Sequence, residues 1–175
     1  MHTGRVQHDG NGWIRCGHGH QHWGRYGAAG LLLVDRRDPD HPSLLLQHRA
    51  PWTSTGDTWG VPGGARDSHE DAAAAALREA EEETGVRAEA VRVLDELEDD
   101  HGGWVYVTVL AELVTAIALR RQDESLELRW VPVDTVDALP LHPGFAGTWP
   151  QLRQLVATHS RTMNQHLPRP SEQNF

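Results

Sequence analysis

The chain of 175 residues contains no lysine, a single cysteine, and only two tyrosines and two phenylalanines beside its seven tryptophans. One cysteine, Cys16, excludes an internal disulfide. No apolar run reaches the length of about 18 residues that a membrane-spanning helix requires. The polar start, residues 1–12, lacks the apolar core of a secretory signal. We therefore expect a cytoplasmic protein that does not enter a membrane.

Positive charge is also scarce. The 16 basic residues, all arginine, stand against 25 acidic residues, which gives a formal net charge of -9. Such a surface argues against a nucleic-acid polymer as partner, because polymers are held by basic patches. A single nucleotide bound through a metal ion remains compatible with it. The length suits one domain, and we expect a monomer or homodimer.

Acidic residues gather at the end of an alanine-rich segment, where four glutamates occupy five positions, Glu79, Glu81, Glu82 and Glu83. Alanine and leucine in the preceding residues 72–77 are strong helix formers. Ser68 is the predicted N-cap, with Asp71 three residues further on. Gly85 can take the left-handed conformation that ends a helix. We predict a helix over residues 70–84.

Three of the glutamates, Glu79, Glu82 and Glu83, are spaced i, i+3 and i+4 and so share one face of this helix. A solvated acidic face is the simple alternative, since each like-charge pair costs only a few tenths of a kcal/mol there. The preceding residues 59–64, Trp-Gly-Val-Pro-Gly-Gly, suggest a strand end and a turn that lets a ligand approach the backbone. Carboxylates together with substrate phosphates suit Mg²⁺, so we predict a magnesium site.

The whole segment resembles the Nudix box, which reads Gly, five residues, Glu, seven residues, Arg-Glu, an aliphatic residue, any residue, Glu-Glu, any residue, Gly, an aliphatic residue. The chain fills this pattern at Gly64, Glu70, Arg78, Glu79, Ala80, Glu82, Glu83, Gly85 and Val86. Ala80 is a small residue for its aliphatic position. The flanking pattern extends the resemblance over most of residues 27–156.

The resemblance implies an α/β/α sandwich with a mixed sheet between helices, and an enzyme that uses Mg²⁺ or Mn²⁺ to hydrolyse a nucleoside diphosphate linked to another group. Glu79, Glu82 and Glu83 would hold the metal, helped by the Gly64 carbonyl. Either Glu79 or Glu83 would orient or deprotonate the attacking water. Glu70 and Arg78 would pair and hold the loop onto the helix.

The compact length of the chain and the residues 59–64 that lead into the box resemble those of MutT-like members. This likeness implies a nucleoside triphosphate, oxidised bases included, cleaved to a monophosphate and pyrophosphate. An ADP-ribose or nucleotide-sugar pyrophosphatase is one alternative, and a non-catalytic Nudix-fold nucleotide sensor is another. Loops are the places where recognition residues concentrate, and a downstream loop supplies a further acid in MutT-like members. The candidate substrate contacts are Arg49, Trp52, Glu98, Asp99, Asp100 and His142.

The first 26 residues form a polar arm rich in glycine and histidine. Within it, Cys16, His18, His20 and His22 alternate, so an extended segment would place them on one side. Thiolate and imidazole are zinc ligands, and a structural Zn²⁺ is one interpretation. The spacing matches no standard zinc pattern, and a flexible histidine-rich arm is the other interpretation.

The Nudix domain is expected over residues 27–159, with a flexible tail at 160–175. Strands are predicted at 30–35, 43–48, 59–61, 87–98, 104–114 and 126–133, the first two joined as a hairpin at Asp38-Pro39-Asp40. Residues 134–139 suit one helical turn. The last helix is predicted to start near Trp149, with Thr148 and Gln151 as a capping box and Pro150 in its first turn.

Overall fold

The computed structural model describes residues 8–165, and its centre is a seven-stranded mixed β-sheet. Five strands follow one another in the order β5-β4-β3-β8-β7, while β6 pairs with β3 and β9 pairs with β4. The strands are β3 (Ala28–Asp35), β4 (Ser43–Arg49), β5 (Trp59–Gly60), β6 (Gly63–Ala65), β7 (Val91–Asp100), β8 (Val105–Leu113) and β9 (Ser125–Pro132). Six of them match predicted segments, and β6 was not predicted.

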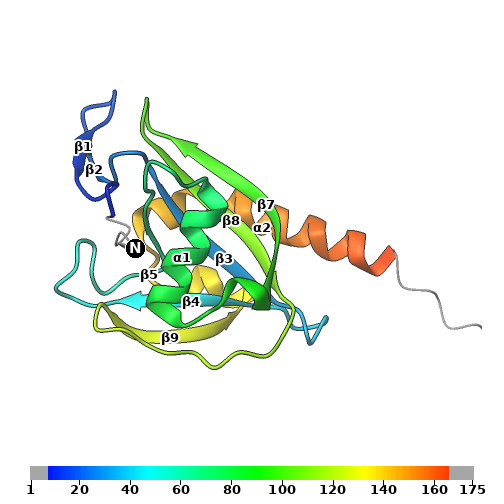
Figure 1. The fold of residues 1–175 in the computed structure, drawn as a ribbon. Coiled ribbons are helices and arrows are strands. Elements are labelled where there is room, and N and C mark those ends of the chain that lie inside the picture. The colour runs from blue at the N-terminus through cyan, green and yellow to red at the C-terminus, as the bar shows by residue number, and fades with distance from the viewer. Residues whose placement is uncertain (1–7, 166–175) are drawn as a thin grey trace, which may run out of the picture.

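Helices α1 (Ala72–Thr84) and α2 (Pro143–Gln165) cover opposite faces of this sheet (Figure 1), which confirms the predicted α/β/α sandwich. Strand β3 shows how the sequence builds the two cores. Leu31 and Leu33 pack with the alanines of α1, whereas Leu32 and Val34 pack with α2. Successive strand residues point to opposite faces, so a strand covered on both sides needs an unbroken apolar run.

The predicted hairpin of β3 and β4 forms only at its closed end. The two strands pair at Val34 with Leu44 and at Asp35 with Ser43, and further along they separate. Beyond that point β5 pairs with β4, and β6 pairs with β3. The segment from β5 to β6 therefore enters the split between the two strands and places the turn at Gly63 and Gly64 within the sheet.

Helix α1 begins later than predicted. Its N-cap is Asp71, whose Oδ1 accepts a hydrogen bond from the Ala74 N–H at 2.7 Å. Ser68 instead binds Asp9 through both its N–H and its hydroxyl. Glu70 is held by Arg78, which keeps the residues before Asp71 out of the helix. The predicted end is confirmed, because Gly85 follows the helix in the left-handed conformation with φ 77°.

Helix α2 begins at Pro143, so the predicted start near Trp149 and the capping box were wrong. Thr148 lies inside the helix, and its hydroxyl donates to the Gly144 carbonyl at 3.1 Å. A buried apolar stripe at helical spacing explains the earlier start, because it stabilises a first turn that contains glycine: Phe145, Trp149, Leu152 and Val156. The helix also continues through Gln165, beyond residue 160, and residues 166–175 of the predicted tail lie outside the described residues.

Two 3₁₀ helices complete the domain, η1 (Ala88–Ala90) before β7 and η2 (Val133–Ala138) after β9; the second matches the predicted helical turn. Ahead of the sheet, β1 (Trp13–Arg15) and β2 (Gln21–Trp23) form an antiparallel hairpin beside the domain (Figure 1). The Gly17 N–H donates to the Gly102 carbonyl at 2.7 Å, which ties this hairpin to the β7–β8 turn. No helix among residues 8–165 is long and apolar enough to cross a membrane.

Candidate active site

Arg78 pairs with Glu70 ahead of α1, as the resemblance to the Nudix box implied. Its Nε lies 2.7 Å from Glu70 Oε1 and its Nη2 lies 2.9 Å from Glu70 Oε2, which makes a bidentate pair. The same Nη2 donates to the Ala65 carbonyl at 2.9 Å. Glu70 holds the pKa of Arg78 above its usual value, and Arg78 holds the pKa of Glu70 below its own. One guanidinium thus joins the loop, the end of β6 and the helix.

Glu79 and Glu83 project from α1 onto the glycine turn. The Gly63 N–H donates to Glu83 Oε2 at 2.9 Å. At Gly64 an added Cβ would lie 2.6 Å from the Glu79 carboxyl carbon, so only glycine leaves room for this carboxylate. Arg78 Nη1 also donates to Glu79 Oε1 at 2.7 Å. Both carboxylates therefore lie against the glycine turn.

The negative charges of Glu79 and Glu83 at this turn are only partly neutralised by neighbouring groups. Burial and the neighbouring Glu79 raise the pKa of Glu83 to about 8. Burial also raises the pKa of Glu79, although Arg78 opposes that shift. A raised pKa means that the folded protein disfavours the charged carboxylate. A cation bound at this point would remove the penalty.

Glu82 and Glu81 are exposed on the same helix. Glu82 stays near the site, since its Oε2 lies 3.5 Å from Arg78 Nη1. The carboxylates of Glu79, Glu82 and Glu83 are not among the groups of described residues whose ligand atoms all lie within 4.8 Å of one another, so the structure does not bring the three predicted ligands into one cluster. By chemistry, these carboxylates and the Gly64 carbonyl are oxygen donors of the kind that a hard divalent ion takes. The residues present therefore fit such an ion in the type of their donor atoms.

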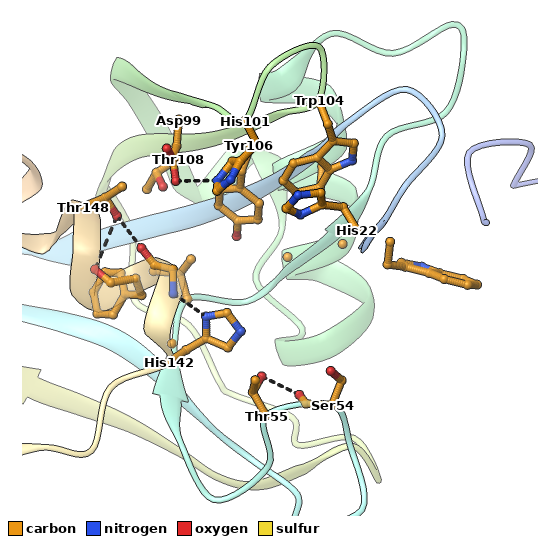
Figure 2. A pocket seen from close by; sticks show the side chains of 18 of the residues that line it. His22, Ser54, Thr55, Asp99, His101, Trp104, Tyr106, Thr108, His142 and Thr148 are labelled. Atoms are coloured by element: carbon orange, nitrogen blue, oxygen red, sulfur yellow. Dashed lines mark hydrogen bonds and ion pairs between the residues drawn. The ribbon is translucent and has the colours of Figure 1, made fainter. Parts of the chain in front are cut away.

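A cavity of about 440 Å³ lies at the glycine turn, and both Gly63 and Gly64 line it. The volume falls in the range of small-molecule sites, roughly 300–1,000 Å³. Figure 2 shows its walls: Trp104 stacks on His22 at 4.1 Å between ring centroids, while His142 and Thr148 close the opposite side. The carboxylates and the cavity thus meet at one turn, with aromatic rings further out.

The predicted substrate contacts separate into two groups. Arg49 and His142 line the cavity. The His142 Nδ1 accepts from the Gly144 N–H at 3.1 Å, and burial followed by the charge of Arg49 lowers its pKa, so the ring is neutral near pH 7. Trp52 does not line the cavity, and 72% of its surface is exposed.

The three acids that were predicted on a downstream loop lie in β7, and only Asp99 lines the cavity. Glu98 and Asp100 are exposed on the opposite side of β7, and Asp100 instead accepts hydrogen bonds from the Gly102 and Gly103 N–H groups. Neither residue lines the cavity, because neighbours on a strand point to opposite faces. Asp99 lies 3.0 Å from the His101 ring, as Figure 2 shows.

The sequence did not single out three cavity residues on and before β8: Trp104, Tyr106 and Thr108. They alternate with Val105, Val107 and Val109, so the period of two placed them on one face. That alternation was a usable signal. His22 comes from the N-terminal hairpin, and its contact with a tryptophan far along the chain has no local signal.

Carboxylates at a glycine turn beside a cavity of this size are the arrangement expected of a hydrolase that acts on phosphoric anhydride bonds. The model of the NUDIX domain matches residues 24–155, and the chain belongs to this family. Members of the family generally use a divalent metal ion.

Relatives agree with this assignment. The chain is 47% identical over 162 residues to a Mycobacterium tuberculosis protein named "Putative 8-oxo-dGTP diphosphatase 3", covering 88% of this chain and 74% of that protein. A Nudix hydrolase from M. smegmatis, RenU, superposes with a TM-score of 0.81 at 45% identity, over 85% of this chain and 96% of that one. A C. elegans Ap4A hydrolase shares the fold, with a TM-score of 0.60 at 19% identity over 75% and 98% of the two chains.

Replacing Arg78 with alanine is expected to lower the free energy of unfolding by about 3 kcal/mol, because the poorly exposed Glu70 then keeps an unpaired charge. Urea denaturation measures the change. Arg153→Ala is the matched control, since its pair with Asp137 is exposed and worth less than about 1 kcal/mol. Equal losses in the two variants would contradict the role given to Arg78.

Proposed function

We propose that this protein is a Mg²⁺- or Mn²⁺-dependent pyrophosphohydrolase that cleaves a nucleoside triphosphate to a nucleoside monophosphate and pyrophosphate. One observation carries the proposal: Glu79 and Glu83 lie against the two glycines that line a nucleotide-sized cavity. The diphosphatase name of the M. tuberculosis relative makes a triphosphate with an oxidised guanine the first substrate to test.

The reaction adds water across an anhydride bond. The water oxygen forms a bond to phosphorus, the bridging P–O bond breaks, and one water proton leaves to a base. When bound, a divalent ion neutralises charge on the phosphates and acidifies the attacking water. Glu79, Glu82 and Glu83 would hold the ion with the Gly64 carbonyl, and Glu79 or Glu83 would accept the proton. The protein otherwise positions the phosphates, as phosphoryl transfer requires.

The cavity offers separate groups to the two ends of a nucleotide. Arg49 lies beside the glycine turn and carries the positive charge that a phosphate needs. The stacked pair of His22 and Trp104 presents aromatic surface, and stacking of a base on such a ring is worth roughly 1–3 kcal/mol. Asp99 and the neutral His142 supply polar contacts for the base or the sugar.

A nucleotide panel with Mg²⁺ tests this function. Release of a monophosphate and pyrophosphate from a triphosphate supports it, and a lower KM for an oxidised guanine nucleotide than for dGTP supports the substrate. AMP and a sugar phosphate formed from ADP-ribose would favour a nucleotide-sugar pyrophosphatase instead. Tight binding without turnover of any nucleotide would indicate a sensor.

Arg49→Ala is expected to raise the KM for a triphosphate about 10- to 100-fold, since a charge-assisted contact to phosphate contributes roughly 1.5–3 kcal/mol. Trp52→Ala, a change three residues further along the chain but outside the cavity, should leave KM within about twofold. Steady-state kinetics compares the two variants. A larger effect at Trp52 than at Arg49 would reverse the assignment.

The proposal also covers the compartment, the oligomeric state and the domain bounds of the enzyme. We place it in the cytoplasm, where small nucleotides are abundant, and expect it to act as a monomer or homodimer without a nucleic-acid polymer as partner. Residues 27–159 would form the catalytic domain, and the preceding residues would complete the cavity through the β1–β2 hairpin. Activity on free nucleotides but not on oligonucleotides is the expected result.

A further inference from the structure

The β1–β2 hairpin brings three soft or borderline ligands together. One ligand atom from each of Cys16, His20 and His22 lies within 4.8 Å of the other two. The backbone causes this: the Gly19 N–H donates to the Cys16 carbonyl, and the Cys16 N–H donates to the His20 carbonyl, both at 2.9 Å. The turn folds the thiol back beside the two rings.

His22 carries an independent sign of a missing ligand. Its Nε2 is buried and has no hydrogen-bond partner among the residues that the structure describes. Buried polar atoms nearly always have a hydrogen-bond partner or a metal ion, so we infer that a ligand binds this nitrogen. The ring itself is held firmly, since it stacks on Trp104 with an interplanar angle of 13° (Figure 2).

The chemistry of the three ligands differs from that of the box. A thiolate and two imidazoles suit Zn²⁺, which takes cysteine and histidine in tetrahedral sites, whereas the carboxylates at the glycine turn suit a hard ion. His18, the fourth residue of the predicted set, does not belong to the triad. Three protein ligands leave one tetrahedral position for a water molecule.

We propose that Cys16, His20 and His22 bind one Zn²⁺, which fixes the β1–β2 hairpin as a wall of the nucleotide cavity. A pair of three-residue strands is only marginally stable by itself, so the ion would add to the hydrogen bond between Gly17 and Gly102 in holding the hairpin. Its residues Trp13, Gln21, His22 and Trp23 line the cavity. This zinc supports the hairpin and is separate from the divalent ion of the box.

Elemental analysis of the purified full chain, after dialysis against buffer without chelator, tests the site. We expect about one zinc per chain in the wild type and in His18→Ala, and at most about one tenth of that in Cys16→Ser and His20→Ala. Glu83→Gln should keep its zinc, which separates this site from the box. His20 is exposed, so its replacement leaves the core intact.

Two further readouts do not depend on hydrolysis. Co²⁺ added to the metal-free wild type should produce a thiolate charge-transfer absorption that Cys16→Ser lacks. Removal of zinc should lower the Tm by several degrees in the wild type and not in His20→Ala. The proposal is overturned if the wild type holds no zinc and gives no Co²⁺ spectrum, or if Cys16→Ser and His20→Ala, folded by circular dichroism, retain the wild-type zinc content.

Discussion

Glu82→Gln is expected to lower kcat by about 10²- to 10⁴-fold with the fold unchanged. The carboxylate is half-exposed and only 3.5 Å from Arg78, so its removal leaves no buried charge without a partner. What it removes is one oxygen ligand of the proposed divalent ion, and metal stabilisation of charge in phosphoryl transfer amounts to several kcal/mol. Steady-state assays at saturating Mg²⁺ measure the loss, and urea denaturation checks stability.

Glu81→Gln is the matched control for this prediction. The same chemical change is made one residue earlier on the helix, at an exposed position that points away from the shared face of the other three glutamates. We expect its kcat to stay within about twofold of the wild type. Similar rates for the two variants, either both low or both normal, would contradict the assignment of Glu82 as a ligand.

Glu83→Gln is expected to stabilise the metal-free protein at pH 8 while it abolishes activity. Burial raises the pKa of Glu83 to about 8 from the usual 4.5. Between these two pH values the folded state holds a proton that the unfolded state has lost. Stability therefore falls as pH rises through this window, on the order of 1.4 kcal/mol per pH unit. Glutamine resembles the protonated acid and can still accept from the Gly63 N–H.

Urea denaturation at pH 5 and pH 8, with and without Mg²⁺, measures this effect. The wild type should lose stability from pH 5 to pH 8 without metal and regain it when Mg²⁺ is added. Glu83→Gln should lose less over the same range and gain little from Mg²⁺. A difference between the two proteins that is the same at both pH values would show that Glu83 does not carry the buried charge.

The sequence predicted the box well because its geometry is local. Spacing of i, i+3 and i+4 puts Glu79, Glu82 and Glu83 on one face of any α-helix, and Gly85 marks its end in a way that few other residues allow. The unbroken apolar run in β3 likewise indicates a strand that is covered on both faces. These features depend on neighbours a few residues away, so they can be inferred without a tertiary structure.

Strand register shows where local reasoning ends. Alternate residues of β7 face the cavity, so the register of the strand decides which of Glu98, Asp99 and Asp100 reaches it. An irregularity between Val93 and Asp95 shifts the pairing of β7 with β8. Asp99 ends opposite Tyr106 and so shares its side of the sheet. A shift by one residue moves every side chain to the other face, and the sequence carries no local mark of it.

By itself, then, the sequence determined the family, the layers of the fold and the acids of the box, since helix period and apolar alternation are properties of neighbouring residues. The tertiary structure alone decided that His22 stacks on Trp104, that α2 starts at Pro143, and that the glycine turn joins the carboxylates to the cavity. Each of those outcomes depends on packing between segments far apart in the chain, where burial outweighs local preference.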